Sequence, residues 1–253
     1  MATELTSQDL LAVVHDPRSA VDLERYFVGT NGALALTGSR FESLCGGGDR
    51  EETANLIAAD DLVAVELLSV NVPQLAALAL LEGPLGRAVA EQLSLIRTDV
   101  DLGTPAAADA LAPGAPARKA YTLLESPRNI GWVTATKLLA RKRPRLVPVY
   151  DRVVRCAVGA PAGPWWWFHE RFAENNYELA TVLRELRLTV EVPDRVSPPR
   201  VLDVVLWMRH HHTHRTTHCA RVEFPDLMEP RSPSLPVGAA GHTKTTTDAE
   251  RQQ

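Results

Sequence analysis

The sequence predicts an all-α protein whose helices form two lobes with a cleft between them. Apolar residues recur at helical spacing through most of the 253 residues, and prolines and glycines separate these stretches. Residues 103–117 are rich in Ala, Pro and Gly, which is typical of a linker between lobes. Residues 1–117 hold 6 basic and 17 acidic side chains, whereas residues 118–155 hold 10 basic and 2 acidic ones. The chain therefore divides by charge near the predicted linker.

Residues 1–102 are predicted to form an acidic N-terminal helical lobe. Its expected helices are Ser7–Val14, Val21–Phe27, Asp60–Val70, Gln74–Leu81 and Gly86–Ile96. The turn signal Gly38-Ser39 predicts one small β-hairpin near residues 33–41. Gly46-Gly47-Gly48-Asp49 is typical of a turn, and no Lys-Ser or Lys-Thr follows it, so it is not a phosphate-binding P-loop.

Residues 118–224 are predicted to form a second helical lobe. Its expected helices are Ala117–Leu124, Val133–Arg141, a helix from Asp151 to about Val158, Trp165–Asn175, Glu178–Arg187 and Pro199–His210. Pro144 and Pro148 keep the segment before Asp151 extended, because proline fixes its own φ and restricts the residue before it. Residues 225–253 contain four prolines, a Thr run and no aromatic residue, so we expect a disordered tail.

Composition excludes several classes of protein. The hydrophobic fraction of 45% and charged fraction of 23% are ordinary for a soluble globular protein, and the net charge of −4 excludes a polybasic one. No apolar run is long enough for a membrane helix, and the N-terminus has no apolar core of a secretory signal. The three cysteines lie far apart, without metal-ligand or redox spacing. We therefore expect a cytoplasmic protein that does not contact membranes.

The segment around residue 130 carries the clearest chemical signal. Asn129-Ile130-Gly131 is a tight turn between two helices, and the first N–H groups of the second helix have no intrahelical partner. Such N–H groups, together with the helix dipole, bind anions. The expected contacts to the phosphates of double-stranded DNA are Asn129, Gly131, Val133, Thr134, Lys137, Arg141 and Lys142. The alternative is that this basic window is an ordinary solvated helix face.

Residues 120–158 resemble the helix-hairpin-helix DNA glycosylase superfamily. The resemblance is carried by the hairpin turn, Thr134-Ala135 at the start of its second helix, the proline-containing extended segment, and the Asp that opens the next helix. It implies a two-lobed helical fold, a hairpin that holds a DNA phosphate, and Asp151 as the catalytic carboxylate over the sugar of a flipped nucleotide. The full chain also resembles an uncharacterised bacterial family.

Three departures from the superfamily pattern refine this expectation. Asn129 stands where a glycine is usual, and Asn tolerates a left-handed backbone better than most residues. Val133 stands where bifunctional members carry the Schiff-base lysine, which implies a monofunctional glycosylase that uses water as the nucleophile. No cysteine cluster follows, so no iron–sulfur cluster is expected, and no other cofactor is.

The sequence leaves the function open between three readings. The first is hydrolysis of the N-glycosidic bond of a damaged or modified base, with Asp151 stabilising the cationic sugar and orienting water. The second is a non-catalytic helix-hairpin-helix DNA-binding protein, and the third is a protein that keeps only the fold. Asp is also a preferred N-cap, so Asp151 has a purely structural alternative.

Aromatic side chains offer candidates for stacking on an extruded base. Tyr150, Trp165 and Trp166 are the candidates, since base-flipping enzymes stack the base between apolar rings. The alternative is that these rings belong to the core. Asp203 lies in an apolar helix, where it must be paired, and we expect an Arg partner.

Histidines cluster near the end of the last predicted helix. On a continued helix, His210, His214 and His218 would share a face, and i, i+4 spacing can bind zinc. No carboxylate is interleaved at helical spacing, and a solvated helix end explains the histidines through the helix dipole. The sequence therefore predicts no metal site.

Overall fold

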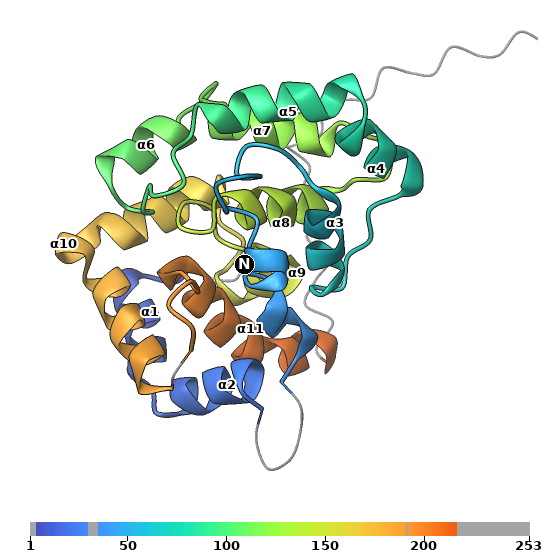
Figure 1. Cartoon of the computed structure of the whole chain (residues 1–253). Coiled ribbons are helices and arrows are strands. Elements are labelled where there is room, and N and C mark those ends of the chain that lie inside the picture. The colour runs from blue at the N-terminus through green and yellow to red at the C-terminus, as the bar shows by residue number, and fades with distance from the viewer. Residues whose placement is uncertain (1–3, 30–34, 191, 217–253) are drawn as a thin grey trace, which may run out of the picture. The chain divides into compact units, whose positions relative to one another are not determined.

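Helices make up most of the chain in the computed structural model, which describes residues 4–29, 35–190 and 192–216 (Figure 1). No strand occurs among these residues, which confirms the all-α expectation. Within the described ranges, no helix is both long enough and apolar enough to pass through a bilayer. The tail predicted for residues 225–253 and His218 lie outside the described residues.

The first part of the chain folds into α-helices and two short 3-10 helices. The α-helices are α1 (Ser7–His15), α2 (Arg18–Phe27), α3 (Ala59–Glu66), α4 (Gln74–Leu81) and α5 (Pro84–Ser94). The 3-10 helices are η1 (Thr37–Arg40) and η2 (Leu44–Gly46). Thr6, and not Ser7, caps α1, because its side chain accepts from the Asp9 N–H while Asp9 accepts from Thr6 in return.

The second part contains six further helices among the described residues. They are α6 (Pro105–Leu111), α7 (Pro116–Glu125), α8 (Trp132–Lys142), α9 (Arg152–Ala157), α10 (Pro164–Thr189) and α11 (Pro198–Thr216). Proline occupies the first turn of α5, α6, α7 and α10, where its missing N–H has no partner to lose. Most of these boundaries lie within a few residues of the predicted ones.

Two segments differ from the prediction or refine it. The β-hairpin near residues 33–41 is wrong, because Thr37–Arg40 form η1 and residues 35–41 contain no strand. Residues 103–117, predicted as a linker, contain α6, which packs on α7 and α10 and buries Ala107 and Leu111. The division of the chain into two lobes at this segment stays a prediction.

Helix α10 is two helices joined end to end, as the sequence predicts. Glu174 is extended, and Asn175, Asn176 and Tyr177 have positive φ, so the helical hydrogen bonding is interrupted there. The sequence signalled this break through Asn175-Asn176, since Asn enters the left-handed region more easily than most residues.

Helix α8 is the most buried helix of the fold. Every side chain from Thr134 to Lys142 is buried, and α8 packs against α3 and α7, beside which it lies in Figure 1. This continuous burial includes charged residues, so α8 cannot be an amphipathic surface helix. Each of its cations must find a partner inside the protein.

Three consecutive cations at the end of α8 bind segments from the N-terminal half. The Lys142 Nζ lies 2.8 Å from Asp61 on α3, and Arg141 contacts the same carboxylate at 3.2 Å. Arg141 also donates to the carbonyls of Phe41 and Leu44. Arg143 donates to the carbonyls of Ala54, Leu93, Ile96 and Lys142, and to the Asn55 side chain. Burial lowers the pKa of Arg143 to about 10, so it stays charged at neutral pH.

Gly48 is required by this charge cluster. A Cβ built on Gly48 would lie 2.5 Å from the Arg141 carbonyl oxygen and 2.8 Å from the Asp61 carboxylate. Gly48 therefore brings its backbone against buried groups, at a distance that no larger residue allows.

We expect Asp61→Asn to destabilise the fold strongly. The change leaves Lys142 and Arg141 buried with no carboxylate between them, and breaking a buried ion pair in this way costs about 3–5 kcal/mol. Lys142→Met should cost less, because Arg141 still pairs with Asp61. The exposed Lys119→Met is the matched control and should change the free energy of unfolding by no more than about 0.5 kcal/mol. Urea unfolding measures all three, and equal stability of Asp61→Asn and Lys119→Met would contradict the role given to Asp61.

Candidate active site

A cavity of about 520 Å³ lies where the hairpin before α8 meets the start of α9, α11 and the segment after α3. A volume of this size suits a small organic ligand. Five predicted site residues line it, namely Gly131, Val133, Thr134, Lys137 and Asp151. The structure therefore brings together the hairpin and the candidate catalytic carboxylate.

The hairpin forms the rim of the cavity. Asn129 has φ of +69°, so it takes a left-handed conformation, which Asn tolerates better than most residues. Gly131 is the N-cap of α8 and has no side chain of its own to cap the first N–H groups of the helix. A Cβ built on Gly131 would meet nothing within 4 Å, so the space over this helix end is open.

Asp151 uses its two carboxylate oxygens differently. Oδ1 accepts from the N–H groups of Val153 and Val154 at 2.9 and 3.0 Å, which caps α9. Oδ2 lies 3.9 Å from the Lys137 Nζ. Asp151 lines the cavity, so one of its oxygens holds α9 while the other lies near the Lys137 amine.

Lys137 lies in the cavity wall and is nearly inaccessible to solvent. Its Nζ donates to the Leu68 carbonyl at 2.8 Å, and the residue is 3% exposed. Burial lowers the pKa of Lys137, while Asp151 and Asp203 oppose this effect. A lysine so placed can contact a ligand inside the cavity, but it cannot reach a phosphate on the protein surface.

A buried charge cluster contributes residues to the cavity wall. Arg200 on α11 forms an ion pair with Asp203 one turn later and lies 2.7 Å from the Glu42 carboxylate. It also donates to the Tyr26 hydroxyl at 2.8 Å and to the Gly38 carbonyl at 3.1 Å. The expected Arg partner of Asp203 is confirmed. Glu42 and Tyr26 were not expected in this cluster from the sequence, in which the i, i+3 spacing of Arg200 and Asp203 is the available signal.

Two expected phosphate ligands face the interior instead of solvent. Arg141 is 2% exposed and Lys142 is fully buried, and both bind Asp61 and the N-terminal segments described above. Half of the ten basic residues between 118 and 155 are buried, namely Lys137, Arg141, Lys142, Arg143 and Arg155. Half of the basic window is therefore internal, and its exposed residue at the cavity is Arg152.

The aromatic stacking candidates also lie elsewhere. Tyr150 and Trp165 are 1% and 3% exposed, and their rings pack edge-on against Phe168 and Tyr121 in the core. Trp166 is exposed and bonds Glu170, away from the cavity lining. The aromatic residues that do line the cavity are Tyr26, Trp132 and Trp207. Trp132 and Trp207 are isolated aromatic residues in the sequence, whereas Trp165-Trp166-Trp167-Phe168 is a conspicuous run, so the run supplied the predicted candidates.

The arrangement can bind a polar or anionic ligand and stabilise positive charge on it. The α8 N-terminus and Arg152 supply positive potential at the rim, while Asp151 supplies a carboxylate beside Lys137. The aromatic walls supply flat apolar surface. This combination suits a ligand with one anionic and one planar part.

The Arg200 cluster gives a pH dependence that can be measured. Two carboxylates share one guanidinium, and burial raises the pKa of Glu42 and raises that of Asp203 to about 7. An aspartate in the unfolded chain titrates near pH 4, so the folded protein binds more protons between about pH 4 and 7. The contribution of Asp203 to the free energy of unfolding is therefore present at low pH and falls as pH rises through that window.

We expect Asp203→Asn to remove this contribution. Urea unfolding gives the free energy of unfolding of the wild type and the variant at intervals between about pH 4 and 8. As pH rises, any advantage of the wild type in this free energy should narrow, or reverse in favour of the variant. Parallel stability curves over the whole window would refute the raised pKa.

Comparison with known proteins assigns the chain to a family without assigning an activity. The model of the family of unknown function DUF6308 matches residues 19–210, a span that contains the hairpin, Asp151 and the Arg200 cluster. No curated protein and no solved structure matches the chain. Because the matched span covers well over half of the sequence, the chain belongs to the DUF6308 family.

Proposed function

We propose that this protein binds DNA and hydrolyses the N-glycosidic bond of a damaged or modified base, in the manner of a monofunctional helix-hairpin-helix glycosylase. The observation that carries the proposal is the position of Asp151. Asp151 lines the same cavity that the hairpin rims, and its Oδ2 lies 3.9 Å from the amine of Lys137. A phosphate-binding turn and a carboxylate at one cavity are the two parts that the reaction needs.

The hairpin supports the DNA-binding part of the proposal. A phosphate at the open side of Gly131 would accept from the first N–H groups of α8 and lie near the exposed Arg152. Arg141 and Lys142 take no part, because the protein interior already holds them. The duplex contact is accordingly small and depends on backbone N–H groups more than on side-chain charge.

The cavity supports the catalytic part. An extruded base would lie against the aromatic walls, with its sugar near Asp151. As the glycosidic bond breaks, positive charge develops on the sugar, and the ionised carboxylate stabilises it and orients the attacking water. Water is the nucleophile, so the proposed reaction requires no cofactor. A DNA substrate is consistent with action in the cytoplasm.

A non-catalytic DNA-binding protein is the second candidate, and one observation favours it. Asp151 Oδ1 accepts from two backbone N–H groups at the start of α9, which by itself explains an Asp at this position. The two candidates share the hairpin and differ in whether the charge of Asp151 is needed for turnover.

Asp151→Asn separates the two roles of this residue. Asn is as good an N-cap as Asp, so the capping hydrogen bonds should be kept, and the melting temperature should fall only through the lost ion pair with Lys137. The loss of the negative charge should lower base release at least about 100-fold. The assay incubates the protein with pooled duplexes that carry uracil, alkylated purines, oxidised bases and mismatches, and reveals abasic sites with hot alkali.

Asp151→Ala is the matched structural variant. It should lose the cap as well as the charge, so its free energy of unfolding should be about 1 kcal/mol lower than that of Asp151→Asn. Base release by wild type and not by Asp151→Asn supports catalysis. Silence of the wild type on every duplex, with binding to DNA retained, leaves the non-catalytic candidate.

Gly131→Asp tests the hairpin. The new carboxylate would cap α8 and so preserve the fold, but it would place negative charge where the phosphate is expected. We expect at least a tenfold loss (about 1.4 kcal/mol) of affinity for duplex DNA by fluorescence anisotropy at low salt.

Gly131→Ala is the control for this substitution. Its Cβ meets nothing within 4 Å and φ is −92°, so affinity should change by less than about twofold. Wild-type affinity should also fall steeply with salt. Equal affinity of the Asp and Ala variants would remove the phosphate role of the hairpin.

A further inference from the structure

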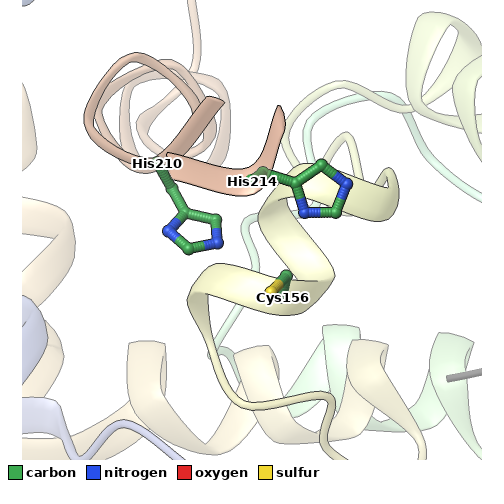
Figure 2. A group of neighbouring side chains, drawn as sticks. All are labelled: Cys156, His210 and His214. Atoms are coloured by element: carbon green, nitrogen blue, oxygen red, sulfur yellow. The ribbon is translucent and has the colours of Figure 1, made fainter. Parts of the chain in front are cut away.

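A second group of chemically active side chains lies apart from the Arg200 cluster, between α9 and α11. Cys156 lies near the end of α9, and His210 and His214 lie one helical turn apart on α11 (Figure 2). The two helices pack against each other. Nothing in the proposed hydrolysis uses this group.

The geometry of the group is that of metal ligands. One sulfur and two imidazole nitrogens lie within 4.8 Å of one another. Ligands around a tetrahedral Zn²⁺ at the usual bond lengths of about 2.0–2.3 Å lie about 3.3–3.8 Å apart, so small side-chain rotations bring these atoms into place. The i, i+4 spacing of the histidines directs both rings to one face of α11.

An unsatisfied nitrogen adds independent support. The Nδ1 of His214 is buried and has no hydrogen-bond partner within residues 4–29, 35–190 and 192–216. A buried polar atom without a partner is costly, and a metal ion would supply the missing contact. The helix-end explanation of these histidines does not account for this atom, because a solvated imidazole would keep its nitrogens in water.

We propose that Cys156, His210 and His214 form a binding site for a zinc ion when Cys156 is in the thiolate form. One thiolate and two imidazoles suit zinc, whose structural and catalytic sites use these ligands. Each of the three residues is partly exposed, so a water molecule or a further ligand can complete the tetrahedron. This differs from the expectation of no metal site, which rested on the missing carboxylate and did not anticipate that α9 would bring a sulfur to the histidines.

The site is coupled to the redox state of its sulfur. Cys156 is disulfide-bonded in this structure, and a disulfide sulfur carries no negative charge for a metal to bind. A dithiol or phosphine reductant supplies two electrons, and with two protons the disulfide becomes two thiols. The Cys156 thiol then loses its proton to bind zinc. Disulfide formation and zinc binding are therefore mutually exclusive states of one cysteine.

Zinc titration of the full-length protein tests the proposal. With a phosphine reductant present and a chromophoric zinc indicator as competitor, we expect wild type to bind one zinc ion tightly, and the unreduced protein to bind at least tenfold more weakly. His214→Ala and Cys156→Ser should each weaken binding by at least tenfold. His212→Ala changes an exposed histidine of the same helix and should bind as wild type does.

Cobalt(II) provides a second readout that does not depend on the variants folding. Reduced wild-type protein should develop a thiolate-to-cobalt charge-transfer band, and zinc should abolish it. Failure of the reduced wild type to bind zinc, absence of the charge-transfer band, or equal zinc affinity in wild type, His214→Ala and Cys156→Ser would overturn the site. Base release and duplex binding are measured separately, so either proposal can fail while the other stands.

Discussion

A cation inside a protein loses the solvation of water, and the end of α8 places three of them there in succession. Arg141, Lys142 and Arg143 recover that loss mainly through groups far away in sequence. The partners are the Asp61 carboxylate, the Asn55 amide and backbone carbonyls between residues 41 and 96. The same helix begins at the hairpin, so the position of the cavity rim depends on how its other end is held.

Local signals made most of the helices predictable. Prolines at first turns, the break at Asn175-Asn176 and the Asp that opens α9 all act within a few residues of the boundary they set. Long-range packing explains where the prediction of local structure was wrong. Gly38 suggested a hairpin turn, yet a Cβ there would lie 2.0 Å from the Tyr26 hydroxyl, so the glycine permits a close approach within a 3-10 helix. Composition cannot tell a glycine needed for a turn from one needed for contact.

The candidate site was predictable in part, for the same reason. The hairpin and Asp151 lie within one continuous segment, and the resemblance that drew attention to them is local too. Glu42, Tyr26 and Arg200 come from three separated elements, and only the fold brings them together. The count of basic residues between 118 and 155 suggested an exposed surface, because such a count says nothing of burial. Asp61, the carboxylate that neutralises Arg141 and Lys142, is 80 and 81 positions away from them. The cavity remains the candidate site because the carboxylate of Asp151, the amine of Lys137 and the N-terminus of α8 meet there, although Arg141 and Lys142 are buried elsewhere.

The long reach of these ion pairs limits how the protein can be divided. A chain that began at residue 118 would keep the hairpin, Asp151 and most of the cavity wall. It would lack Asp61 and the carbonyl of Leu68, so Lys142 and Lys137 would have to be buried without their partners. The hairpin half is therefore not a portable module. Recombination that moved it into another protein would carry its charges without their counterparts, and the smallest unit that can be inherited intact includes the N-terminal helices as well.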